Sequence, residues 1–180
     1  MADVAELLRR NAEFAAGAFL DGPRLTLRGG GLMIIGCVDP RVDPAHVLGL
    51  RNGDAAVLRN PGGRITPSTL RALKTLAKVG EVNPGHRPVP ANLVILHHTK
   101  CGLTGLTSHV DLLAEYFEVP VTELAARSVN DPHGSVRADI EIIRRHVHRP
   151  DYLVSGLVYD VDTGVVDVAV PPTQVPVRDE

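Results

Sequence analysis

The segment LMIIGC, residues 32–37, is a short uninterrupted apolar run that ends on a cysteine. Such a run between turn-forming residues is typical of a strand buried on both faces of a parallel sheet. Three further segments have the character of strands, and the last of them leads through the turn Asp162-Thr163-Gly164 into a hairpin partner. They are residues 54–60, 92–98 and 152–159, and the hairpin partner covers residues 165–170.

Helical periodicity occupies much of the chain between these strands. Thr66 followed by Pro67 predicts the N-cap and first turn of a helix that extends to about Gly80. The alternation predicts an α/β fold with a mainly parallel central sheet of four strands plus an antiparallel edge strand, and helices on both faces. We also expect a helix over residues 1–20, further helices over 103–117, 121–127 and 136–148, a loop over 81–90 and an extended tail over 171–180.

Bulk properties narrow the class of protein. A length of 180 residues with 44% hydrophobic and 22% charged residues predicts a single domain covering residues 1–180. A net charge of −2 without runs of like charge argues against nucleic acid as a partner. The apolar runs are too short to cross a membrane, and Asp3 and Glu6 stand where a signal peptide is basic and then apolar. We therefore expect a cytoplasmic protein.

Residues suited to metal binding stand where two of the strands end. Cys37 closes the first strand, His98 closes the third, and Cys101 follows three positions later. They include the only two cysteines of the chain, and parallel sheets gather ligands at the carboxyl ends of their strands. Two thiolates and an imidazole suit tetrahedral zinc better than magnesium or calcium. We predict a Zn²⁺ site formed by Cys37, His98 and Cys101.

Asp39 decides whether such a zinc site is catalytic or structural. If the guanidinium of Arg41 holds its carboxylate, Asp39 can accept a hydrogen bond from zinc-bound water. If Arg41 releases it, Asp39 is a possible fourth ligand that closes the site. The residues alone leave other interpretations open: Asp39 and Arg41 as an ion pair without chemistry, and Cys37 and Cys101 as buried thiols or a redox pair.

Three segments, GCVDPRV at 36–42, RNPGGR at 59–64 and HHTKCG at 97–102, together resemble the signature stretches of the compact β-class carbonic anhydrases. The resemblance implies Cys37, His98 and Cys101 as zinc ligands and Asp39 and Arg41 as the catalytic dyad. It also implies a homodimer or dimer of dimers, in which the N-terminal helix lies on the partner. Two residues depart from the pattern: Pro61 replaces a usual alanine, and Lys100 stands where compact members commonly carry aspartate.

The resemblance implies reversible hydration of CO₂ to bicarbonate and a proton, by attack of zinc-bound hydroxide. The nearest alternative within this chemistry is a hydrolase of carbonyl sulfide or carbon disulfide that uses the same hydroxide. A third alternative is a non-catalytic zinc-binding protein. We predict a carbonic anhydrase and keep the other two functions as alternatives.

Overall fold

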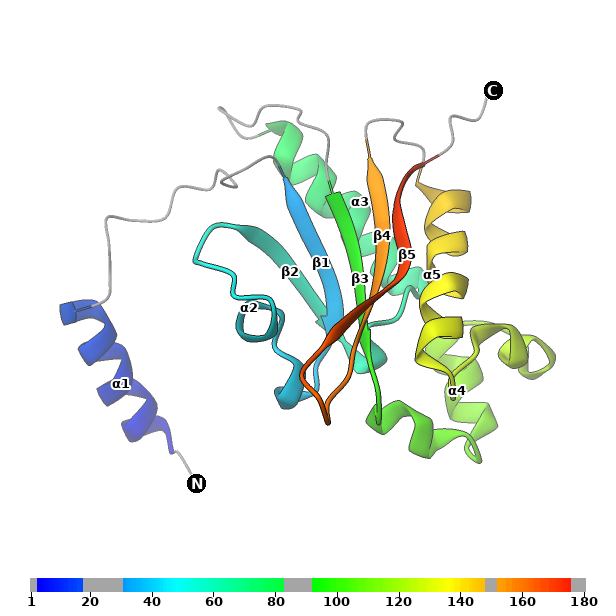
Figure 1. The fold of residues 1–180 in the computed structure, drawn as a ribbon, viewed down its shortest axis with the longest axis horizontal. Helices are drawn as coiled ribbons and strands as arrows, with labels where there is room; N and C mark the ends of the chain where they lie inside the picture. The colour runs from blue at the N-terminus through cyan, green and yellow to red at the C-terminus, as the bar shows by residue number, and fades with distance from the viewer. Residues whose placement is uncertain (1–2, 18–30, 83–91, 148–151, 176–180) are drawn as a thin grey trace.

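The computed structural model describes residues 3–17, 31–82, 92–147 and 152–175, and its centre is a five-stranded sheet (Figure 1). The strands lie in the order β2-β1-β3-β4-β5, with the first four parallel and β5 antiparallel to β4. Their bounds are Leu32–Cys37 (β1), Ala55–Asn60 (β2), Asn92–His98 (β3), Leu153–Tyr159 (β4) and Val166–Gln174 (β5). The predicted four parallel strands and antiparallel edge strand are confirmed.

Five α-helices and four short 3₁₀ helices accompany the strands in the described parts of the chain, and all but α1 lie between strands. The α-helices are α1 (Val4–Gly17), α2 (Pro44–Val47), α3 (Pro67–Val82), α4 (Val110–Phe117) and α5 (Pro132–His146). The 3₁₀ helices are η1 (Pro40–Val42), η2 (Pro61–Gly63), η3 (Gly102–Leu106) and η4 (Val121–Arg127). Helix α3 begins as predicted, because the hydroxyl of Thr66 accepts a hydrogen bond from the Thr69 N–H at 3.2 Å.

The main core lies between the sheet and the helices α3 and α5. Ile35 of β1 and Ile95 of β3 are fully buried there, together with Ile140 of α5, and Leu70 of α3 packs against the same cluster. These strand residues alternate with others that point to the opposite face, as strand geometry requires. Ile34 lies buried on that second face. The long helices α3 and α5 both cover the face that carries Ile35 and Ile95. The short helix α2 lies on the other face.

Helix α5 approaches β4 so closely that the strand needs a glycine. A Cβ atom added at Gly156 would lie 2.1 Å from Cγ1 of Val136 and 2.8 Å from Cδ1 of Ile140. On the other face, a Cβ atom at Gly36 would lie 3.3 Å from Cγ of Pro44, the first residue of α2. Small residues in the strands thus fix how near the helices come to the sheet.

The helix expected over residues 103–117 is wrong as a continuous element. The chain forms η3, then leaves helical geometry at His109, and only then enters α4. Hydroxyl side chains explain the interruption, because Thr104 donates to the Cys101 carbonyl at 2.7 Å and Thr107 donates to the Thr104 carbonyl at 3.1 Å. Such side-chain bonds to the preceding turn compete with a regular helix.

The ends of several elements differ from the sequence-based bounds. The helix expected at 121–127 is the 3₁₀ helix η4, and α5 begins at Pro132 because Asp131 caps it, not at residue 136. Strand β5 continues to Gln174, so residues 171–174 belong to the sheet. Residues 18–20, 148 and 176–180, and most of the expected 81–90 loop, lie outside the described residues.

Helix α1 has none of its residues buried. Its large apolar side chains Val4, Leu7 and Leu8 are all more than half exposed. No helix in the described parts of the chain combines the length and the apolar character needed to span a membrane.

Candidate metal centre

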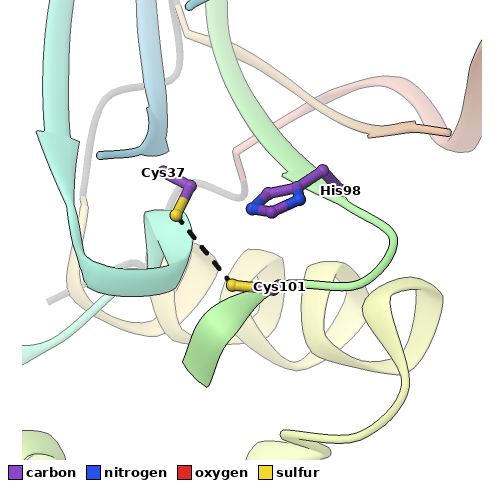
Figure 2. Close-up of side chains that lie close together, drawn as sticks. All are labelled: Cys37, His98 and Cys101. Carbon is purple, nitrogen blue, oxygen red and sulfur yellow. Dashed lines mark hydrogen bonds between the residues drawn. The ribbon is translucent and has the colours of Figure 1, made fainter. Parts of the chain in front are cut away.

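Three side chains from two parts of the chain meet at the carboxyl end of the sheet (Figure 2). Cys37 ends β1, His98 ends β3, and Cys101 follows in the next turn. The two sulfur atoms lie 3.9 Å apart, and the nearest ligand atoms of all three residues lie within 4.8 Å of one another. Two thiolates on a tetrahedral zinc ion, with bonds of about 2.3 Å, are separated by about 3.8 Å. The spacing of the sulfurs fits that ion.

The imidazole of His98 is oriented by its own backbone neighbour. Its Nδ1 lies 2.8 Å from the Thr99 carbonyl oxygen, so Nδ1 carries the proton and donates it. Nε2 is then the lone-pair atom, and it is buried without a hydrogen-bond partner. No other buried side-chain nitrogen or oxygen in the described ranges lacks a partner. This partnerless nitrogen and the two neighbouring sulfurs together offer three ligand atoms to a zinc ion.

A left-handed residue turns the chain back between His98 and Cys101. Lys100 has a φ of 52°, a conformation that a side chain with a Cβ atom adopts at a cost. Two hydrogen bonds to the end of β4 and the turn after it hold this segment: the Thr99 N–H donates to the Tyr159 carbonyl at 2.9 Å, and the Val161 N–H donates to the Thr99 hydroxyl at 3.0 Å. The left-handed conformation of Lys100 therefore turns the chain so that Cys101 comes close to Cys37.

The two thiols differ in how readily each one loses its proton. The Cys101 thiol and the N–H groups of Asp39 and Gly62 stabilise the Cys37 thiolate and lower its pKa, although burial opposes them. The pKa of Cys101 is raised, because Cys101 hydrogen-bonds to Cys37 and a second thiolate would lie beside the first. A metal cation between the two sulfurs would remove that repulsion, so both thiols could lose their protons when a metal is bound.

Arg41 holds the carboxylate of Asp39 with both ends of its guanidinium. Nε donates to Oδ1 at 3.0 Å, the second nitrogen donates to Oδ2 at 2.6 Å, and the Arg41 N–H also reaches Oδ1 at 3.0 Å. The same guanidinium donates to the Lys100 carbonyl at 3.0 Å. The Arg41 hydrogen bonds hold the pKa of Asp39 well below its usual range. Asp39 is held beside the cluster of Cys37, His98 and Cys101 and is not one of its members.

Comparisons with known proteins agree with this geometry. The family model for carbonic anhydrase matches residues 32–115, the segment that carries the whole cluster. Beta-carbonic anhydrase 1 of Mycobacterium tuberculosis is 26% identical over 174 residues, covering 92% of this chain and 97% of that protein. The crystal structure of carbonic anhydrase from Streptococcus mutans superposes with a TM-score of 0.69 at 28% identity, covering 94% of this chain and 98% of that one. Over the matched segment and in its overall fold, the chain is similar to the β-carbonic anhydrases.

A second activity occurs among the proteins to which this chain is similar. The carbon disulfide hydrolase of Saccharolobus solfataricus is 26% identical over 160 residues, covering 73% of this chain and 74% of that protein. Its identity to this chain equals that of the mycobacterial carbonic anhydrase. Overall identity therefore does not separate the two activities.

Arg59 also supports the site, and the sequence analysis did not assign it a role. Its guanidinium donates to the carbonyls of Cys37 at 2.8 Å and Asp39 at 2.7 Å, and to the carboxylate of Asp43 at 2.7 Å. It thus fixes the backbone on both sides of residue 38. Its place in the RNPGGR stretch, one of the family's signature segments, was the available signal.

Lys100, which departs from the family pattern, directs its charge away from the cluster. Its ammonium group forms an ion pair with Asp162 at 2.6 Å, and both side chains are mostly exposed. Asp162 lies in the turn between β4 and β5. The contact of Lys100 with the site is made by its carbonyl oxygen, which accepts from Arg41. Its charge is therefore shared with solvent and Asp162.

Proposed function

We propose that this protein is a zinc-dependent carbonic anhydrase that interconverts CO₂ and bicarbonate. One observation carries the proposal: a cluster of three donors, Cys37, His98 and Cys101, with a carboxylate clamped beside it. Three donors leave a position on a tetrahedral metal for water or substrate, which distinguishes catalytic from structural zinc sites.

The donor set suits zinc by its chemistry and by its spacing. Cys37 and Cys101 supply two sulfurs, and His98 supplies a buried Nε2 that lacks any other partner. Zinc bound there would lower the pKa of a water molecule enough to supply a nucleophile near neutral pH. The protein residues then have to keep the metal position open and orient the nucleophile.

Asp39 has the geometry to orient a nucleophile beside the metal. An ionised carboxylate offers about four acceptor positions, and the three donor groups of Arg41 leave one of them free. The lowered pKa keeps Asp39 ionised and therefore able to accept a hydrogen bond across the neutral range. The Arg41 clamp also opposes a swing of Asp39 onto the metal, which would close the site.

The test is stopped-flow CO₂ hydration with zinc content measured on the same preparation. We expect one zinc per chain and hydration that rises with pH as the nucleophile forms. Zinc at full occupancy without hydration between about pH 7 and about pH 9 would contradict the enzyme and favour a non-catalytic zinc protein. Protein that lacks zinc after purification would contradict the metal assignment.

A second candidate substrate deserves the same assay, because carbon disulfide hydrolases are among the relatives. Hydrolysis of carbon disulfide or carbonyl sulfide releases hydrogen sulfide, which CO₂ hydration cannot produce. Hydrogen sulfide release at a kcat/KM above that for CO₂ would replace the first proposal by the second. We expect both activities to depend on the same three donors, Cys37, His98 and Cys101.

The proposed assembly is a homodimer or a dimer of dimers in the cytoplasm. The exposed apolar side chains of α1, Val4, Leu7 and Leu8, support a contact between copies, since burying them is favourable. Sedimentation equilibrium of the full chain measures the mass directly. A monomer at micromolar concentration would contradict the assembly without affecting the zinc site.

A further inference from the structure

A buried ion pair lies behind the metal centre and joins two distant parts of the chain. Arg64 follows the turn η2, and Asp139 lies in the middle of α5. The Arg64 Nε donates to Oδ2 of Asp139 at 2.8 Å, and a second guanidinium nitrogen donates to Oδ1 at 3.2 Å. Both side chains are fully buried. Charges removed from water in this way need every available partner to remain in place.

The same carboxylate also contacts the backbone next to the turn. Oδ2 of Asp139 accepts from the Ile65 N–H at 3.1 Å and lies 3.4 Å from Nε2 of the buried His97. His97 Nε2 also lies 3.2 Å from the Gly63 carbonyl oxygen, and because both neighbours are acceptors, its single N–H is shared between Gly63 and Asp139. Asp139 therefore holds Arg64 and Ile65 directly and Gly63 through His97.

The turn that these contacts fix bears directly on the metal ligand Cys37. The Gly62 N–H donates to the Cys37 sulfur at 3.3 Å. Gly62 and Gly63 both have positive φ, 75° and 67°, and a Cβ atom at Gly63 would lie 2.9 Å from the Cys37 nitrogen. Only glycine allows the backbone to approach the ligand this closely.

We propose that Asp139 is a positioning residue for the metal ligand Cys37. Through Arg64, Ile65 and His97 it fixes the glycine turn, and the turn aims the Gly62 N–H at the Cys37 sulfur. The inference rests on the proposed zinc site and extends it to a residue of α5. A hydrogen bond to a ligating thiolate fixes its direction, and loss of such supporting contacts weakens metal binding about 10- to 100-fold. Asp139 therefore governs how long the metal stays bound.

The main variant replaces the pair by apolar side chains of similar size, Arg64→Met with Asp139→Leu. Replacing both charges leaves neither one unpaired in the core, so the protein remains folded. We expect zinc transfer to a coloured chelator to be about tenfold faster than in the wild type. We also expect the sulfur-to-metal absorption band of the Co²⁺-substituted protein to shift, because the Cys37 sulfur loses its fixed donor.

A single variant and a matched control separate positioning from stability. His97→Phe removes the N–H donated to Gly63 and leaves the ion pair in place; it is expected to accelerate zinc loss by a smaller factor. Ile143→Val creates a small cavity in the same helix without touching the turn, so Tm falls and the rate of zinc loss stays at the wild-type value.

Each outcome has a defined meaning. Wild-type protein that binds no zinc overturns both the proposed metal site and this inference. Wild-type protein with one zinc and a double variant that releases zinc at the wild-type rate overturns the inference alone. Equal acceleration in Ile143→Val and in the double variant also overturns it, because loosened packing would then explain the effect.

Discussion

Two arginine–aspartate pairs with the same bidentate geometry stand near the site, but their surroundings differ. Arg41 is 51% exposed and Asp39 is 14% exposed, and they lie two residues apart, whereas Arg64 and Asp139 are 2% and 0% exposed and lie 75 residues apart. A pair that water reaches contributes little to stability, because solvent screens it. Breaking a buried pair leaves a charge without solvent or partner. The Asp39–Arg41 pair is thus suited to a role in catalysis, and the Arg64–Asp139 pair is suited to holding the fold in place.

The largest expected effect comes from breaking the buried pair on one side. Arg64→Ala leaves Asp139 charged in the core, and we expect a loss of about 3–5 kcal/mol in the free energy of unfolding. Urea denaturation followed by circular dichroism measures it. Arg41→Ala is the matched change in the exposed pair and leaves the urea midpoint nearly unchanged. Equal losses in the two variants would contradict the distinction between the pairs.

The exposed pair is expected to show the opposite balance between activity and stability. Asp39→Asn keeps the shape of the side chain but weakens its role as acceptor, so CO₂ hydration falls about 100-fold. Zinc content stays at one per chain, and Tm changes by less than about 2 °C. Asp167→Asn, an exposed change on β5, serves as the control and retains full activity. Full hydration by the zinc-loaded Asp39→Asn variant would remove Asp39 from the mechanism.

Acid distinguishes the buried pair in a different way. Burial alone would raise the pKa of Asp139, but the His97 hydrogen bond and the Arg64 charge outweigh burial and lower it. A carboxyl with a lowered folded pKa adds stability that is complete above its unfolded pKa of about 4 and is lost as pH falls. We expect wild-type stability to fall more steeply from about pH 5 to about pH 3 than that of Arg64→Met with Asp139→Leu. Parallel curves would contradict the lowered pKa.

The smallest effect is expected at Lys100. Its ion pair with Asp162 is exposed on both sides, so Lys100→Ala changes the free energy of unfolding by less than about 1 kcal/mol. The carbonyl that accepts from Arg41 belongs to the backbone and remains. Thermal unfolding and zinc content measured together test this expectation. Loss of zinc in this variant would show that the lysine charge reaches the cluster.

The sequence predicted those parts of the structure whose signals are local. Apolar runs marked the parallel strands, and Cys37, His98 and Cys101 stood out because each lies at or just beyond a strand end. The continuous helix at 103–117 was wrong, because Thr104 and Thr107 bond to the preceding turn and periodicity does not register such bonds.

The buried pair was missed because its two members are distant in the chain. A weaker signal did exist in α5, where Asp139 interrupts an apolar stripe made by Val136, Ile140 and Ile143. A charged residue on the buried side of a helix requires a partner, but the sequence does not say which of its many arginines supplies it. Only the folded sheet brings Arg64 to that helix.

Gly156 gives this arrangement an unexpected point of vulnerability. It carries no functional group, yet any side chain there would displace Val136 and with it the helix that carries Asp139. A random mutagenesis screen for zinc-deficient protein would therefore recover changes at Gly156 in β4, a residue that no inventory of ligands would include. How well β4 tolerates a substitution at residue 156 therefore depends on how closely α5 packs against it.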